Sequence, residues 1–306
     1  MRELKFIVEK DDEGLGLRKL LKKRFGFSSR LLTKLSARKR VFLNGATLQG
    51  HMKPKSGDVI VAVLPEEKSF FPEADIPINV VYEDQDLLVI DKQPKVTVHP
   101  TRLHQDKTIA NGLMRYMRVN KRSFKIRFVN RLDMDTSGLL IVGKNSNAQD
   151  NIVNQMQNHR VQKVYMALVH GIPERDGFTI DLPIGRPDPE SPVRSVLDEA
   201  CGGKPSTTHV EVIERFSAGY ALVKLRLETG RTHQIRVHLT HLGHPICGDA
   251  LYGGASPGFI DRQALHACEL SFLHPVTGKR LNLTSPLPED FLKAMDSISL
   301  IGPDKL

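Results

Sequence analysis

Two short segments carry most of the residues that can do chemistry. The first, residues 130–138, places an arginine, two carboxylates and two hydroxyls between two apolar segments. Arg131 and Asp133 are two positions apart, so on an extended segment their side chains point to the same side. A carboxylate beside a cation stays ionised and positioned, as a nucleophile or general base must be. Asp133 is therefore the candidate catalytic residue.

The remaining polar residues of this loop have a simpler interpretation. Asp135, Thr136 and Ser137 are residue types that form turns by hydrogen-bonding to nearby backbone, and we expect them to do so here. The pair Asp133-x-Asp135 also occurs in phosphatases that form an aspartyl phosphate. Those enzymes need an apolar strand directly before the first aspartate and Thr or Val four residues after it. Neither condition is met, so the phosphatase interpretation is disfavoured.

The second segment, residues 230–249, holds four histidines and a cysteine, which raises the question of a zinc site. His238 and His241 are spaced to share a helix face, and Cys247 follows. His233, however, lies five residues before His238 and is turned off that face. Neither a Cys-x-x-Cys pair nor His-Glu-x-x-His accompanies them. We expect no metal here, and histidines that cap and pack a helix.

Arg231 does not fit that packing role. It stands at the start of a predicted helix, residues 232–242, where the helix dipole disfavours a cation. It therefore needs an anionic partner. We expect that partner to be Asp133, which would join the two segments at one site.

The elements that must position these residues form a strand-rich body. Alternating apolar residues predict strands at 124–130, 138–144, 164–170, 209–216 and 221–228, and longer periodic stretches predict helices at 109–119 and 148–160. This pattern is typical of the α+β class. We expect a mainly antiparallel mixed sheet with a central active-site cleft over residues 78–306.

The N-terminal part differs from this body in its charge. The chain has 44 basic and 35 acidic residues, a net charge of +9, and residues 1–60 alone have 15 basic and 6 acidic residues. The whole excess therefore lies in the first fifth of the chain, which is typical of an appendage that binds a polyanion. We predict a helix–helix–hairpin module over residues 1–62, with helices at 14–26 and 30–36, and a linker at 63–77. Its basic residues Arg30, Lys34, Arg38, Lys39 and Arg40 would form one basic face, the predicted site of polyanion binding.

Composition and cysteine content set the remaining limits. The chain is 40% apolar and 26% charged, a globular mixture, and it lacks the run of about 18 apolar residues that a membrane span needs. Its three cysteines are widely separated, so we expect no disulfide framework and a cytoplasmic location.

Two resemblances follow from the motifs. Leu31 to Gly45, with a closing Gly57 to Ile60, resembles the alpha-L type RNA-binding module. Arg-Leu-Asp-x-x-Thr-Ser-Gly-Leu-Leu, then Gly-Arg-Thr-His-Gln-Ile-Arg-Val-His and Gly-His-Pro-Ile-x-Gly-Asp, resembles the large-subunit-type (Rlu-type) RNA pseudouridine synthases. Blocks at 92–100, 163–171 and 265–267 agree in order and spacing. Together these resemblances cover nearly the whole chain.

The resemblance implies an isomerase that breaks the glycosidic bond of a flipped uridine, rotates the uracil and rejoins it through carbon, without a cofactor or metal. Asp133 would be the catalytic carboxylate, by attack on the anomeric carbon or by removal of the 2′ proton. Arg231 would keep it ionised. Tyr165 would stack on the uracil and assist the final deprotonation. Arg131 and Lys163 would bind the substrate.

One residue departs from the family pattern. The family usually has histidine before Arg-Leu-Asp, and this chain has Asn130. Asparagine can still donate a hydrogen bond at the substrate site and position the loop, but it cannot act as an acid or base. We expect a monomer acting on structured RNA, with ribosomal RNA favoured and transfer RNA open. A non-catalytic RNA chaperone or ribosome-assembly factor is the alternative, and conversion of uridine would distinguish the two.

Overall fold

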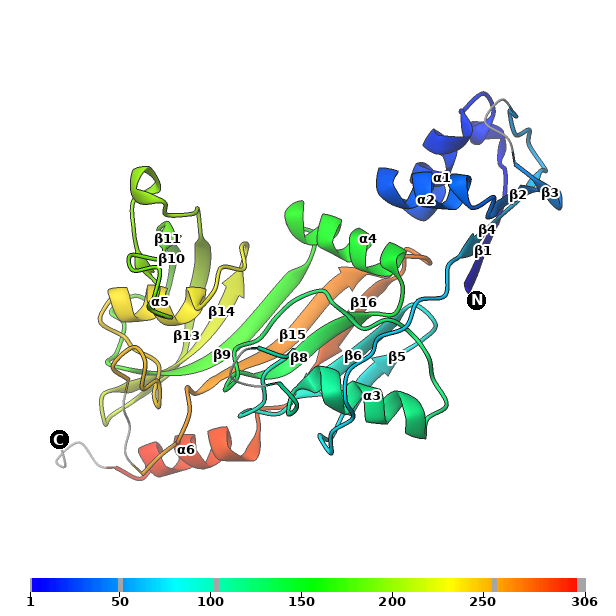
Figure 1. Cartoon of the computed structure of the whole chain (residues 1–306). Helices are drawn as coiled ribbons and strands as arrows, with labels where there is room; N and C mark the ends of the chain where they lie inside the picture. Colours follow the sequence, from blue (N-terminus) through cyan, green and yellow to red (C-terminus); the bar gives the residue numbers. More distant parts are fainter. Residues whose placement is uncertain (1, 49–51, 102–104, 255–257, 302–306) are drawn as a thin grey trace.

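The computed structural model describes residues 2–48, 52–101, 105–254 and 258–301. A large body is crossed by one long sheet, and a small module lies at its N-terminal end (Figure 1). In the body the strand order is β10-β13-β14-β9-β15-β8-β6-β5, with β16 beside β15 and β7 beside β8. The strands are β5 (Asn79–Glu83), β6 (Leu87–Lys92), β7 (Arg127–Phe128), β8 (Ser137–Gly143), β9 (Gln162–His170), β10 (Gly177–Asp181), β13 (Thr207–Phe216), β14 (Tyr220–Leu227), β15 (Leu265–Leu273) and β16 (Arg280–Thr284).

The pairing confirms the predicted α+β class with a mainly antiparallel sheet. Among the named strand pairs of the described residues, β8 and β15 are the one parallel pair, and the others are antiparallel. A separate short hairpin joins β11 (Ile184–Gly185) to β12 (Ser195–Val196). Its position beside the main sheet becomes important for the site described below.

Helices cover both faces of the central strands. They are α3 (Ile109–Val119), α4 (Ser146–Gln157), α5 (Gln234–His241) and α6 (Glu289–Ser299), with a short 3-10 helix at Glu199–Cys201. Successive side chains of a strand point to opposite faces. Accordingly, Leu139 and Ile141 pack in the same cluster as α4 residues, whereas Leu140 and Val142 pack with residues of α3 and α6. Strand β8 is therefore apolar on both faces, because both of its faces are buried.

The helix predictions are confirmed, with small shifts at the ends. The predicted helix at 109–119 matches α3. The helix predicted at 148–160 begins earlier because the Asn145 side chain accepts a hydrogen bond from the Ala148 amide, 2.9 Å, and caps α4. The helix predicted at 232–242 begins at Gln234, because His233 has a left-handed backbone and stands before the first turn.

The N-terminal module has its own sheet and core. The sheet order is β1-β4-β2-β3, and helices α1 and α2 pack on it after a 3-10 turn at Lys10–Asp12. The elements are β1 (Arg2–Ile7), α1 (Leu17–Phe25), α2 (Ser29–Ala37), β2 (Val41–Leu43), β3 (Ala46–Thr47) and β4 (Val59–Leu64). Ser28 caps α2, because its hydroxyl accepts from the Leu31 amide at 3.2 Å. Sequence analysis did not predict β1, and the boundary it placed at residue 62 falls inside β4.

The predicted linker has no regular structure but is held to the body. Residues 65–78 form neither helix nor strand. The Ser69 hydroxyl accepts from the Ile126 amide at 2.9 Å, and the Pro72 carbonyl accepts from the Asn111 side chain at 2.8 Å. Glu67 forms ion pairs with Lys34 of the module, 3.0 Å, and with Arg127 of the body. Residues 65–78, which we call the strap, are therefore bound to both the module and the body.

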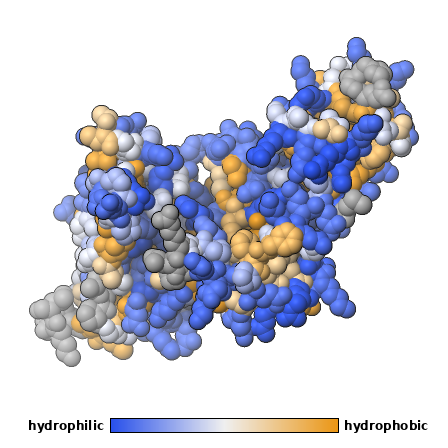
Figure 2. Space-filling model, in the orientation of Figure 1, coloured by the Kyte–Doolittle hydropathy of each residue, from blue (hydrophilic) through white to orange (hydrophobic). Residues whose placement is uncertain are grey.

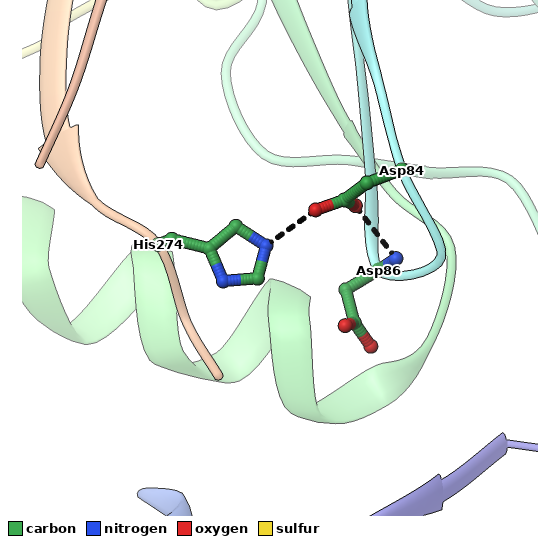
Figure 3. A group of neighbouring side chains, drawn as sticks. All are labelled: Asp84, Asp86 and His274. Carbon is green, nitrogen blue, oxygen red and sulfur yellow. Dashed lines mark hydrogen bonds and ion pairs between the residues drawn. The ribbon is translucent and has the colours of Figure 1, made fainter. Parts of the chain in front are cut away.

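A second contact between module and body involves acidic groups that resemble a metal site. Asp84, Asp86 and His274 are the one group with metal-ligand spacing among the described residues (Figure 3). Their atoms already have partners in the protein. Arg2 donates to both carboxylate oxygens of the buried Asp86, at 3.1 and 2.8 Å, and His274 Nε2 lies 2.7 Å from Asp84. Backbone amides also donate to Asp84 and to His274 Nδ1. The group is therefore an ion-pair clamp that fastens β1 to the body.

Candidate active site

Buried side chains fix the position of the loop between β7 and β8. Lys92 is fully buried, and its ammonium donates to three carbonyls, those of Gln93, Val96 and Met134, at 2.8, 2.9 and 2.8 Å. Burial lowers the pKa of Lys92 to about 7. Arg262 donates to the Asp135 carbonyl at 3.0 Å. The loop backbone directly after Asp133 is therefore anchored at two successive carbonyls, those of Met134 and Asp135.

The side chains after Asp133 do not bond as expected. The sequence interpretation gave Asp135, Thr136 and Ser137 bonds to their own backbone. Instead, Gln263 Nε2 donates to the Thr136 hydroxyl at 3.3 Å, and the Ser137 hydroxyl lies 2.9 Å from Nδ1 of His266. Both partners come from the β15 region, nearly 130 residues away. Those partners could not be foreseen because the parallel pairing of β8 with β15 brings them together.

Close approach of these strands depends on Gly138. Its φ is +109°, and a Cβ atom placed there would lie 2.3 Å from the carbonyl oxygen of Ala267. Only glycine avoids that clash and adopts this backbone without strain. The glycine of the Thr-Ser-Gly motif therefore allows the catalytic loop to end directly against β15.

Asn130 holds the beginning of the same loop. Its Nδ2 donates to the Leu139 carbonyl at 3.3 Å, and its Oδ1 accepts from the Ile141 amide at 2.8 Å. Both ends of the amide therefore bond to β8, and the residue also lines the cavity described below. The hydrogen-bonding role expected of Asn130 in loop positioning fits this geometry, whereas its contact with substrate stays a prediction.

The cation that pairs with Asp133 is Arg236, and the expected pair with Arg231 is wrong. Nη1 of Arg236 donates to Oδ2 of Asp133 at 3.0 Å. Arg231 is exposed, and its Nε donates to the Pro205 carbonyl at 3.1 Å. The physical reason is the late start of α5, which leaves Arg231 before the helix and carries Arg236 into the interior. The two segments do meet at one site, but through a different arginine.

Arg236 is held rigidly between two carboxylates. Its Nε and Nη2 donate to Oδ2 and Oδ1 of Asp249 at 2.7 and 2.8 Å, and the Asp249 side chain is only 1% exposed. The guanidinium also lies over the Tyr252 ring, 4.9 Å from its centroid. Burial alone would lower the pKa of Arg236, but the hydrogen bonds and charge of Asp249, together with Asp133, raise it instead. Asp133, 30% exposed, thus faces a fixed positive charge while remaining open to solvent.

His233 completes the surroundings of the carboxylate. Its Nδ1 lies 2.8 Å from the Tyr252 hydroxyl, and its Nε2 lies 3.8 Å from Asp133. Burial lowers the pKa of His233, partly opposed by Asp133. The expectation of a histidine that only caps the helix missed this position. His238 does pack inside as expected, between the Thr208 hydroxyl and the Leu182 carbonyl.

A cavity of about 490 Å³ lies against Asp133, and six of the predicted site residues line it. They are Asn130, Arg131, Asp133, Lys163, Tyr165 and Arg231. Arg131 is exposed and has no ion pair with Asp133 within 4.0 Å among the described residues, so the two share the cavity without pairing. A volume of this size lies within the range of pockets that bind small molecules and is adequate for one nucleoside.

Two residues of β9 form one side of this cavity. Burial, followed by the charge of Asp133, raises the pKa of the Tyr165 hydroxyl, so the phenol is neutral near pH 7. Lys163 is also buried, donates to the Thr229 carbonyl at 2.9 Å, and has a pKa lowered by burial to about 8. A neutral ring suits stacking on uracil. To act as a base, Tyr165 would first have to lose its proton, which its raised pKa disfavours.

The predicted RNA-binding residues of the module are placed in two ways. Arg30, Arg38 and Lys39 are exposed, and Arg40 is half-buried. Lys34 is bound to Glu67 of the strap, so its charge is already neutralised there. Figure 2 shows hydrophilic residues gathered over α1 and α2 on the visible face. The exposed cations Arg30, Arg38 and Lys39 therefore lie at the two ends of α2.

Sequence reasoning missed four residues that build the site: Lys92, His233, Arg236 and Arg262. Lys92 and Arg236 lie inside motif blocks that the sequence analysis recognised. No role was assigned to Lys92, and the pairing with Asp133 was assigned to Arg231 instead of Arg236. Arg262 lies outside every block. Its loop role depends on an ion pair with Asp290 of α6, at 2.6 Å, which no local pattern reveals.

Comparison with known proteins gives a consistent result. Residues 86–241 match the family described as RNA pseudouridylate synthase. An uncharacterised RNA pseudouridine synthase of Bacillus subtilis, YlyB, is 39% identical over 86% of this chain and 87% of its own. Ribosomal large subunit pseudouridine synthase D of Pseudomonas aeruginosa is 40% identical over 83% and 82%, respectively. The solved structure titled "Human RNA Pseudouridylate Synthase Domain Containing 1" is also similar. The match covers 76% of this chain and 99% of the human chain, at 28% identity and a TM-score of 0.56.

Within the described ranges, no helix has both the length and the apolar character that crossing a bilayer requires.

Proposed function

The chain belongs to the RNA pseudouridylate synthase family and isomerises uridine in RNA to pseudouridine, and we propose that ribosomal RNA is its substrate and Asp133 its catalytic carboxylate. One observation carries the assignment of Asp133. Its carboxylate is the acidic group on the 490 Å³ cavity that is held by a buried arginine yet remains 30% exposed. A group that reacts with a sugar must be fixed and reachable, and Asp133 meets both conditions.

Isomerisation rearranges bonds within one nucleotide. The N1–C1′ bond breaks, the uracil turns within the cavity, and a C5–C1′ bond forms, with loss of the proton from C5 and gain of a proton on N1. Asp133 can start this sequence by attacking C1′ or by removing the 2′ proton, and both routes fit its position. Arg236 holds the carboxylate in place through either route, and Tyr165 stacks on the uracil while it turns.

The other site residues bind the nucleotide. Arg131 and Lys163, which both line the cavity, offer cations to the extruded nucleotide, while Asn130 holds the loop. The uridine must leave its stack to enter, so the enzyme binds a flipped base. The protein acts in this way as a monomer in the cytoplasm.

Ribosomal RNA is supported by two features. Ribosomal large subunit pseudouridine synthases are among the relatives that are about 40% identical over most of the chain. The N-terminal module adds nine net positive charges beside a body whose remaining charges cancel. Such a module supplies affinity for folded RNA without reading sequence.

The substrate is tested by mapping pseudouridines in ribosomal and transfer RNA from cells with and without the gene. We expect one or a few ribosomal positions to lose pseudouridine in the deletion strain and to regain it when the wild-type gene is restored. Restoration with the Asp133→Asn gene should not return them. Loss confined to transfer RNA would overturn the ribosomal assignment but leave the isomerase activity standing.

The module is tested by neutralising Arg30, Arg38 and Lys39 with glutamine, because truncation at residue 62 would cut β4. We expect RNA affinity to fall at least about tenfold at 150 mM salt, and the slope of log K against log salt to flatten by about one for each lost phosphate contact. Neutralising Lys10, Lys53 and Lys55 in the same module is the matched control. Equal losses in both variants would mean that the ends of α2 are no specific RNA anchor.

A further inference from the structure

A second cavity opens directly beside the one that contains Asp133. Its volume is about 390 Å³, and it shares Gly230, Arg231 and Thr232 with the first cavity. Its outer wall is the β11–β12 hairpin and the segment that follows. Arg231 therefore stands on the border between the two cavities, although it makes no ion pair with Asp133.

The charges around this second cavity are all of one sign. Four cations line it, and no carboxylate does; the cations are Arg186, Arg194, Lys204 and Arg231. Within the described part of the chain, none of the four has an acidic partner within 4.0 Å. Buried arginines of the body, by contrast, are paired, as Arg236 is with Asp249. Uncompensated cations around a concave surface attract an anion strongly.

The arginines are held in place by backbone carbonyls. Arg186 Nε donates to the Ser191 carbonyl at 2.9 Å, and Arg194 Nη1 donates to the carbonyls of Pro192 and Val193, both at 3.1 Å. Arg231 Nε is bound to the Pro205 carbonyl. Each guanidinium uses one nitrogen in this way and keeps others for a ligand. A guanidinium with two free N–H groups matches the oxygens of a phosphate.

The wall itself is built to stay in this position. Ile184 and Lys204 exchange two backbone hydrogen bonds of 2.9 Å, and Gly203 approaches so closely that a Cβ atom there would lie 1.7 Å from the Leu197 carbonyl. Arg186, Arg194 and Lys204 are thus presented by a fixed hairpin and the segment bonded to it, which reduces the ordering cost of binding.

We infer that this second cavity binds backbone phosphate of the RNA strand beside the flipped uridine, with Arg231 between that phosphate and the nucleoside. The inference rests on the proposed function only in taking RNA as the substrate, and it holds for ribosomal or transfer RNA alike. An extruded nucleotide remains joined to the strand by its phosphates, so anion contacts next to its cavity keep it in register. Arg186, Arg194 and Lys204 thereby become substrate-positioning residues.

The test uses Arg186→Gln with Lys204→Gln in the full chain. The control, Lys121→Gln with Arg175→Gln, removes two exposed cations elsewhere on the body. The RNA is an oligonucleotide around whichever uridine the wild-type enzyme modifies in total RNA from deletion cells. We expect KM to rise at least about tenfold with kcat within about threefold, and the salt slope to flatten by about one to two. The control should change neither quantity.

A second measurement identifies the phosphate itself. Single phosphates flanking the target uridine are replaced by neutral methylphosphonate. At the contacted position the wild-type enzyme should lose as much affinity as the double variant does, and the double variant should lose little more. Lys204→Arg with Arg186→Lys should restore most of the affinity because the charges return. Additive losses at every position, or a fall in kcat with KM unchanged, would overturn the inference. Failure to find any ribosomal target would sink only the ribosomal assignment.

Discussion

Replacing Asp133 with asparagine is expected to abolish pseudouridine formation, a loss of at least about 10⁴-fold in rate, while RNA affinity stays within about threefold. The amide keeps the shape of the side chain and can still accept the hydrogen bond from Arg236. It is neither an anionic nucleophile nor a base at neutral pH, so chemistry stops while binding continues. Single-turnover assays and equilibrium RNA binding measure the two effects separately.

A matched control lies two residues along the same loop. Asp135 lies outside the two cavities that Asp133 lines, and Arg262 holds its backbone carbonyl rather than its carboxylate. Asp135→Asn should therefore keep the rate within about threefold of wild type. Wild-type turnover by Asp133→Asn, or equal loss in both variants, would remove Asp133 from the chemistry.

Replacing Arg236 with lysine is expected to cause the second-largest effect, on stability as well as on rate. Lysine retains one positive charge but cannot serve Asp249 with two bonds and Asp133 with a third. The buried Asp249 is then poorly paired, and breaking a buried pair costs about 3–5 kcal/mol when one partner is removed, which sets the upper limit for lysine. We expect a lower free energy of unfolding by denaturant and a single-turnover rate reduced at least about 100-fold.

Arg231→Gln separates this role from that of the other arginine. Arg231 is exposed and touches neither Asp133 nor Asp249 by any bond in the described structure. Its loss should leave stability within about 0.5 kcal/mol and weaken RNA binding more than the rate at saturation. A stable Arg236→Lys enzyme with wild-type rate, beside an inactive Arg231→Gln enzyme at saturating RNA, would restore the pairing that the sequence suggested.

The difference between these two arginines shows what the sequence could establish. Periodicity and caps were adequate for the helices, because those signals are local: Ser28 caps α2, and the stretch 109–119 is helical over its full predicted length. The candidate catalytic carboxylate was also recognisable, since Asp133 stands in a dense polar loop between apolar strands. These features depend on neighbours in the chain.

The partners of that carboxylate depend on tertiary structure instead. His233 adopts a left-handed backbone, φ 59°, which delays the start of α5 and decides which arginine faces inward. A positive φ at a non-glycine residue is not visible in a residue pattern. Lys92 and Arg262 reach the loop from 40 to 130 residues away, and their burial is a property of the assembled sheet. The sequence therefore indicated the candidate site but not the buried residues that hold it in place.

The clamp between Arg2 and Asp86 has a consequence for target choice. Together with the strap at Glu67, it attaches the basic module to the body at two places and limits how far the module can swing. The distance between RNA bound to the module and the nucleoside opposite Asp133 would then be set by the protein. We therefore expect the enzyme to select its uridine by its distance along a folded RNA, and to tolerate changes in the intervening bases that preserve that distance.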